Sequence, residues 1–80
     1  MDDADIVECI DRLSAEEHQL EQAHIGEALS AAEVERLEQL QVALDRCWDL
    51  LRQRRARRAA GKDPSAAVQR SADVVERYQQ

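Results

Sequence analysis

The sequence has 80 residues, enough for one small domain, and its many Ala, Glu, Leu, Arg and Gln residues with only two Gly and one Pro are typical of a helical protein. The formal net charge of −6 argues against a general affinity for nucleic acid. The aspartates that follow Met1 are unlike the basic start of a signal peptide, and no apolar run approaches membrane-spanning length. We therefore expect a cytoplasmic protein that does not associate with membranes.

The first predicted helix runs from Asp2 to about His24. Acidic side chains at its start suit the positive end of the helix dipole. Its apolar residues recur at helical spacing, and Gly26 is the expected end of the helix. The apolar face consists of Ile6, Ile10, Leu13 and Leu20.

The second predicted helix is the longest element and runs from Ser30 to Gly61. Ser30 and Glu33 have the spacing of a capping box, and Gly61 suits the position just past a helix end. Its apolar sector is roughly 140° wide, which exceeds a two-stranded coiled-coil seam. The sector consists of Val34, Leu37, Leu40, Leu44, Cys47, Trp48 and Leu51. We expect Trp48, Leu44 and Leu51, with Ile10 of the first helix, to anchor the core.

The connection between these helices is short, which forces them to run antiparallel. Facing residues should then have numbers that sum to about 55. This register places Asp3 near Arg52 and Cys9 near Cys47. A disulfide between them would pin the two helices together, if its strict geometry were met. The alternative, which we expect in a reducing compartment, is that both cysteines are reduced and pack as small apolar side chains.

The fold class predicted is all-α: a hairpin over residues 1–61, followed by a turn and a short helical tail over residues 62–80. Asp63 can cap a short helix that begins at Pro64, and Ser71 can cap another. Val74, Val75 and Tyr78 would pack from the last helix onto the hairpin. Because one hairpin buries little apolar surface, we expect two copies to form a four-helix bundle.

The end of the second helix is rich in arginine. These side chains could bind the phosphates of a nucleic acid or an anionic partner, or could be neutralised by the helix C-terminus and by Asp2, Asp3 and Asp5. The partner-binding candidates are Arg54, Arg55, Arg57 and Arg58. Arg57 and Arg58 should extend past the first helix and remain free for a partner.

A weaker pattern is Glu17, Glu21 and His24, whose spacing puts them on one helix face. Glu21 and His24 match the Glu-x-x-His unit of di-metal bundles, but the same residues could simply interrupt the apolar seam and fix the choice of partner. The sequence contains no nucleophile–base pair and no glycine-rich phosphate loop. We therefore predict no enzymatic activity, no cofactor and no metal, with this trio as the only weak metal candidates.

The chain opens with MDDADI, carries Glu16-Glu17-His18, contains the run LDRCWDLLRQRRARRAAGKDP, and closes with Val75-x-x-Tyr78. Together these stretches resemble a family of small actinobacterial proteins of unknown function. The resemblance implies an uncharacterised, cytoplasmic, two-helix protein and supplies no activity. We predict a helical protein-interaction or regulatory module that dimerises and has a possible protein partner. The alternatives are a nucleic-acid-associated factor and a metal-binding bundle.

Overall fold

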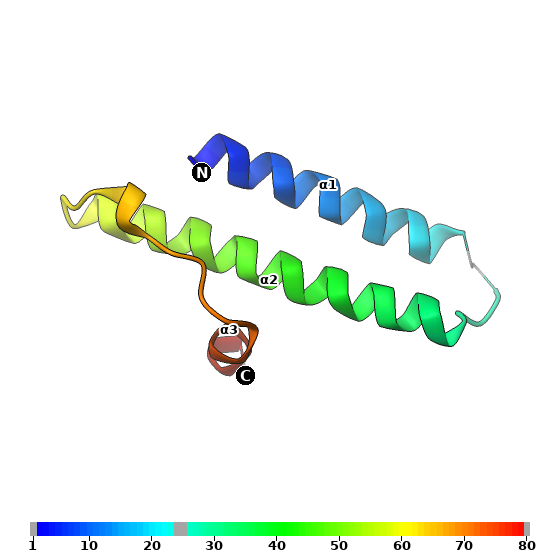
Figure 1. The fold of residues 1–80 in the computed structure, drawn as a ribbon. Coiled ribbons are helices and arrows are strands. Elements are labelled where there is room, and N and C mark those ends of the chain that lie inside the picture. The colour runs from blue at the N-terminus through cyan, green and yellow to red at the C-terminus, as the bar shows by residue number, and fades with distance from the viewer. Residues whose placement is uncertain (1, 24–25, 80) are drawn as a thin grey trace.

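The computed structural model describes residues 2–23 and 26–79, the last three of these by their backbone alone. The regular secondary structure of these residues is entirely helical, with no strand, as predicted. The elements are α1 (Asp3–Gln22), α2 (Ala31–Ala59), the 3-10 turn η1 (Pro64–Ala66) and α3 (Ala72–Gln79). Figure 1 shows α1 and α2 lying side by side as an elongated hairpin.

Both long helices begin at capping boxes. The Asp2 carboxylate accepts the Asp5 amide at 2.9 Å, and the Asp5 carboxylate accepts the Asp2 amide at 3.1 Å. Ser30 and Glu33 exchange the equivalent pair of hydrogen bonds at the start of α2. These reciprocal bonds satisfy amides that no helical carbonyl can reach, so the starts of α1 and α2 are fixed by local sequence.

The end of α2 is also determined by local sequence. Gly61 has φ +71°, a left-handed conformation that glycine adopts without steric cost. Its amide donates to the Arg58 carbonyl at 3.0 Å, and the next amide, of Lys62, donates to the Arg57 carbonyl at 2.7 Å. This pair of bonds is the Schellman arrangement, which ends the helix and reverses the chain.

The core lies between α1 and α2. Ile6 and Leu51 are almost fully inaccessible to solvent, with 0% and 1% of their surface exposed. Three of the four expected anchors are buried there, namely Ile10, Leu44 and Leu51. The whole buried cluster comprises Ile6, Ile10, Leu44, Cys47, Leu50 and Leu51.

Trp48, the fourth expected anchor, lies outside this cluster, with 42% of its surface exposed. The expectation that it fills the hairpin core is therefore wrong for the single chain. Its neighbour Cys47 points into the core, and each step along a helix turns the side chain by about 100°. Trp48 therefore faces a different direction from Cys47 and lies outside the buried cluster.

The tail folds back along α2. Both η1 and α3 pack on α2, and α3 lies on the opposite side of α2 from α1 (Figure 1). Ser71 caps α3 by accepting the Val74 amide, and Val75 is 1% exposed. Asp63 caps η1 by accepting the Ser65 amide at 2.9 Å, with Pro64 in the first position as predicted.

Within the described residues, no helix is long and apolar enough to cross a bilayer.

Replacing Leu51 with Ala should lower the free energy of unfolding by about 2–5 kcal/mol, because the side chain is buried and leaves a cavity. Urea denaturation followed by circular dichroism measures this change. The control is Val68→Ala, in a side chain that is 67% exposed, which should change stability by less than about 0.5 kcal/mol. Equal effects of the two substitutions would contradict the placement of the core.

Candidate functional site

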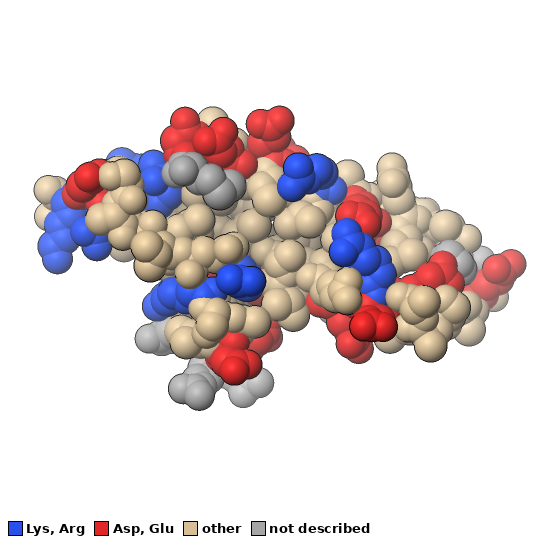
Figure 2. All heavy atoms as spheres, in the orientation of Figure 1, with Lys and Arg blue, Asp and Glu red and all other residues tan. Residues whose placement is uncertain are grey.

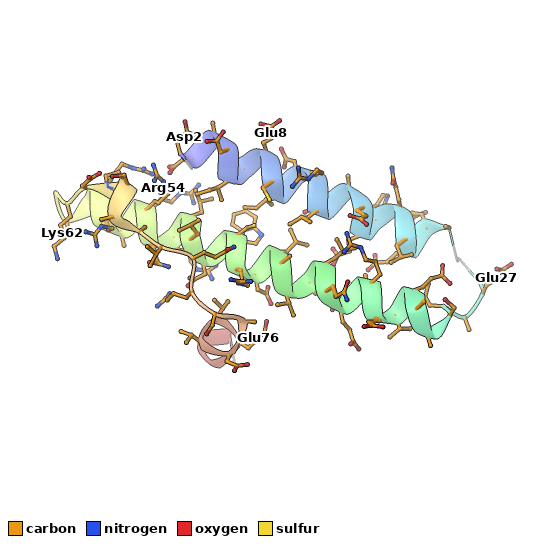
Figure 3. The ribbon with its side chains drawn as sticks, in the orientation of Figure 1. Asp2, Glu8, Glu27, Arg54, Lys62 and Glu76 are labelled. Atoms are coloured by element: carbon orange, nitrogen blue, oxygen red, sulfur yellow. The ribbon has the colours of Figure 1, made fainter. Side chains whose placement is uncertain are left out.

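The arginine-rich end of α2 is joined to the start of α1 by one carboxylate. Arg54 donates its Nε to Asp3 Oδ1 at 2.6 Å, and Arg58 donates to both oxygens of the same carboxylate. Figure 3 shows Arg54 at the end of the hairpin where α1 begins. Because Arg58 and Arg54 donate hydrogen bonds to the carboxylate, the pKa of Asp3 is lowered from 3.8 to about 2.

The same arginines also hold the turn that follows α2. Arg54, which is only 8% exposed, donates a second hydrogen bond to the Pro64 carbonyl at 3.2 Å. Arg57 donates to the Asp63 carbonyl at 2.7 Å. A buried guanidinium needs both a counter-charge and acceptors for its remaining donors, and this turn supplies the acceptors.

These contacts change the interpretation of the arginine run. The expectation that Arg57 and Arg58 remain free is wrong: α1 begins far enough along α2 for Asp3 to reach Arg58, and the turn captures Arg57. Arg54 is buried rather than presented to a partner. Of the four candidates, Arg55 alone is exposed and makes no hydrogen bond or ion pair with the described residues. Figure 2 shows the basic end with acidic side chains directly beside it.

A second polar set on α2 binds the tail, and sequence reasoning missed it. Gln53 donates to the Val68 carbonyl at 2.9 Å, and Arg46 donates to the Arg70 carbonyl at 3.0 Å. Together with Asp49, Gln53 and Arg46 recur at helical spacing on one face of α2. We call Arg46, Asp49 and Gln53 the tail-binding stripe.

Asp49 is the centre of this stripe. It is 3% exposed, and its carboxylate accepts hydrogen bonds from Gln53 and from two nitrogens of Arg70. The hydrogen bonds from Arg70, followed by that from Gln53, hold the pKa of Asp49 below its usual value of 3.8. The stripe therefore attaches the residues before α3 through an ion pair and through backbone carbonyls.

Further along the tail, α3 presents an acidic side chain to α2. Glu76 hydrogen-bonds with Asp45, and this contact together with desolvation raises the pKa of Glu76 above 4.5. Oε1 of Glu76 is buried and has no hydrogen-bond partner among the described residues. A second carboxylate beside Glu76 disfavours its ionised form, so this contact opposes the docking of α3 when both groups are charged.

Two exposed apolar side chains lie on another part of α2. Val34 and Trp48 are 41% and 42% exposed, and Gln41 between them is also exposed. With Arg55, these residues are separated by seven positions each and therefore lie along one side of α2. We call Val34, Gln41, Trp48 and Arg55 the Trp48 stripe.

The described residues provide no site for the metal ion of the metal-binding alternative. Among residues 2–23 and 26–79, no three His, Cys, Asp or Glu side chains are close enough to hold a metal ion. Glu17 is half-buried and Glu21 is exposed. His24 lies outside the described residues.

The two cysteines meet across the hairpin, as the predicted register required. Their sulfur atoms are 3.7 Å apart, with Cys47 buried and Cys9 partly exposed. Arg12 Nη2 donates to Cys9 Sγ at 3.6 Å. Burial, followed by the contact with Cys9, raises the pKa of the Cys47 thiol to about 11.

The fold and its contacts define a small helical hairpin whose basic end and tail are held by the chain's own charged side chains. The chain belongs to a family described as "Protein of unknown function (DUF2630)", whose model matches residues 2–80.

Relatives in mycobacteria match nearly the whole chain. It is 46% identical over 77 residues to the uncharacterized protein Rv0898c of Mycobacterium tuberculosis, which covers 95% of this chain and 88% of the relative. The uncharacterized protein Mb0922c of Mycobacterium bovis matches with the same identity and coverage. The predicted resemblance to actinobacterial proteins of unknown function is thus confirmed. No solved structure matches the chain.

Acidification should weaken the hairpin through Asp3. A carboxylate whose pKa is lowered on folding stabilises the fold above its unfolded value of 3.8, and this stabilisation disappears as the pH falls toward about 2. Asp3→Asn should therefore make the melting temperature less dependent on pH between 4 and 2. The control is Asp11→Asn, an exposed aspartate of α1. Identical pH dependences for wild type and Asp3→Asn would contradict the role of Asp3.

The tail should open more readily when Asp49 loses its charge. Asp49→Asn keeps the shape of the side chain but weakens its bonds to Arg70, so the tail should be destabilised by about 1–3 kcal/mol. Amide hydrogen exchange at Val75, whose amide donates to the Ser71 carbonyl, should accelerate about tenfold or more. Exchange at Ile10 in the hairpin core should not change. Asp73→Asn, at an exposed position of α3, is the control, and equal exchange in both variants would count against the stripe.

Proposed function

We propose that the protein is a non-enzymatic helical interaction module that associates with a second copy of itself through the Trp48 stripe. The observation that carries this proposal is the 42% exposure of Trp48, the only tryptophan in the chain. Tryptophan offers the largest apolar surface of any side chain and is enriched where proteins meet. In the single protomer, the other helices leave a large part of this side chain exposed to solvent.

The rest of the stripe suits a helical partner. Val34, Gln41 and Trp48 follow one another at seven-residue intervals, the spacing with which two helices pack along a seam. The register that places Cys9 beside Cys47 also brings Val7, which is 41% exposed, level with Trp48. A polar residue such as Gln41 within a seam favours one register and one partner over others.

A second copy is the occupant that charge favours. Residues 1–49 carry 14 acidic and 3 basic side chains, whereas residues 50–80 carry 8 basic and 3 acidic ones. A two-fold antiparallel dimer centred on Gln41 would place Trp48 of one copy opposite Val34 of the other. The same symmetry would bring Arg55 to the acidic half of the second copy. The result would be a four-helix bundle.

Sedimentation velocity and Trp48 fluorescence test this proposal together. The wild type should dimerise at micromolar concentration, with its emission shifting to shorter wavelength as protein concentration rises. Trp48→Ser should remain monomeric at the same helical content, and Arg55→Glu should weaken the dimer about tenfold or more. Val68→Ser, at an exposed tail residue outside the stripe, is the matched control.

The result that would overturn the proposal is a wild type that stays monomeric at 100 µM or so with unchanged Trp48 emission. A salt-dependent affinity for RNA or DNA that is lost in Arg55→Glu would favour the nucleic-acid alternative instead.

A further inference from the structure

We propose that Cys9 and Cys47 are a redox-active dithiol that a hydroperoxide converts into a disulfide between α1 and α2. The two sulfurs are already in contact at 3.7 Å, although the residues are 38 positions apart in the chain. A disulfide requires the sulfurs to approach to about 2.05 Å, which side-chain rotation and small helix shifts can supply. Only the hairpin register brings the two residues together.

The surroundings of the two sulfurs differ in a way that assigns their roles. Cys9 is partly exposed, so an oxidant dissolved in water can reach its sulfur. Arg12 donates to that sulfur at 3.6 Å and so places a positive charge beside it. Cys47 is only 7% exposed and is shielded by the core residues around it. Cys9 is therefore the attacking residue and Cys47 the resolving one.

The reaction balances in two steps. Cys9 Sγ attacks one oxygen of the hydroperoxide, the O–O bond breaks, and Cys9 becomes a sulfenic acid while an alcohol or water leaves with the thiol proton. Cys47 Sγ then attacks Cys9 Sγ, the S–S bond forms, the S–O bond breaks, and water leaves with the proton of Cys47. The two thiols lose two electrons and the peroxide gains them.

Reversal needs a reductant, and a small-molecule thiol is sufficient. Two thiol molecules cleave the bridge by exchange, which restores both cysteines and leaves the reductant as its own disulfide. In the oxidised form a covalent bond joins α1 to α2 next to the core residue Ile10. The two helices therefore cannot separate at that point of the hairpin. The bridge should raise the melting temperature by roughly 10 °C, because it constrains the unfolded chain.

Oxidation of the full chain with hydrogen peroxide, followed by intact mass spectrometry, tests the proposal. The wild type should lose about 2 Da with no intermolecular product, and dithiothreitol should restore the original mass. Peptide mapping should identify a Cys9–Cys47 crosslink. Cys47→Ser should stop at the Cys9 sulfenic acid, which dimedone traps, and Cys9→Ser should react at least about tenfold more slowly.

Two further variants separate chemistry from folding. Arg12→Gln should slow the reaction with peroxide several-fold, whereas Arg12→Lys, which keeps the positive charge, should retain the wild-type rate. Circular dichroism should show the same helical content for every variant. Because the wild-type mass change needs no substitution, the proposal remains testable even if a cysteine variant unfolds.

Three results would overturn the proposal. The first is accumulation of a Cys9 sulfinic acid in the wild type while Cys47 stays a free thiol. The second is a disulfide that forms only between molecules and in proportion to protein concentration. The third is an oxidised protein whose melting temperature equals that of the reduced one.

Discussion

The apolar contact between α1 and α2 is the constraint on which the rest of the structure depends. Ile6 of α1 and Leu51 of α2 are almost completely buried, so sliding either helix by one turn would expose both. This contact fixes the register along the hairpin. The register in turn brings Asp3 to Arg54, Glu16 to Arg36 and Cys9 to Cys47, three contacts that differ in chemistry but share one geometric origin.

Much of this architecture could be predicted from sequence because its determinants are local. The capping pair at Ser30 and Glu33 and the glycine at 61 lie within one turn of the backbone groups that they satisfy. The register followed from the short connection, which is why the meeting of Cys9 and Cys47 was predictable. The exact partner of Asp3 was not, because a shift of a few residues separates Arg52 from Arg54 and Arg58.

The spacing of Arg54 matches that of the buried residues of α2, but arginine is usually an exposed residue, so its buried role was not predicted. Arg54 and Arg58 continue the three- and four-residue spacing of Leu44, Cys47 and Leu51, and Asp3 precedes Ile6 on the same face of α1. The predicted neutralisation of these arginines by the aspartates that begin α1 is observed for Asp3, whereas the alternative, that the arginines are presented to a partner, does not hold for Arg54 and Arg58. The tail-binding stripe was harder still to predict from the sequence. The acceptors for Arg46 and Gln53 are main-chain carbonyls, which any residue can supply.

The carboxyl pair of Asp45 and Glu76 has a consequence for how the molecule comes apart. An acid whose pKa is raised on docking favours the docked state below its ordinary value of 4.5, and that contribution disappears as the pH rises through the raised value. As the pH rises through that value, α3 comes to rest on α2 with two repelling carboxylates in its contact. A rise in pH should therefore favour undocking of the last helix, whereas the apolar contact between α1 and α2 should not respond to this pair.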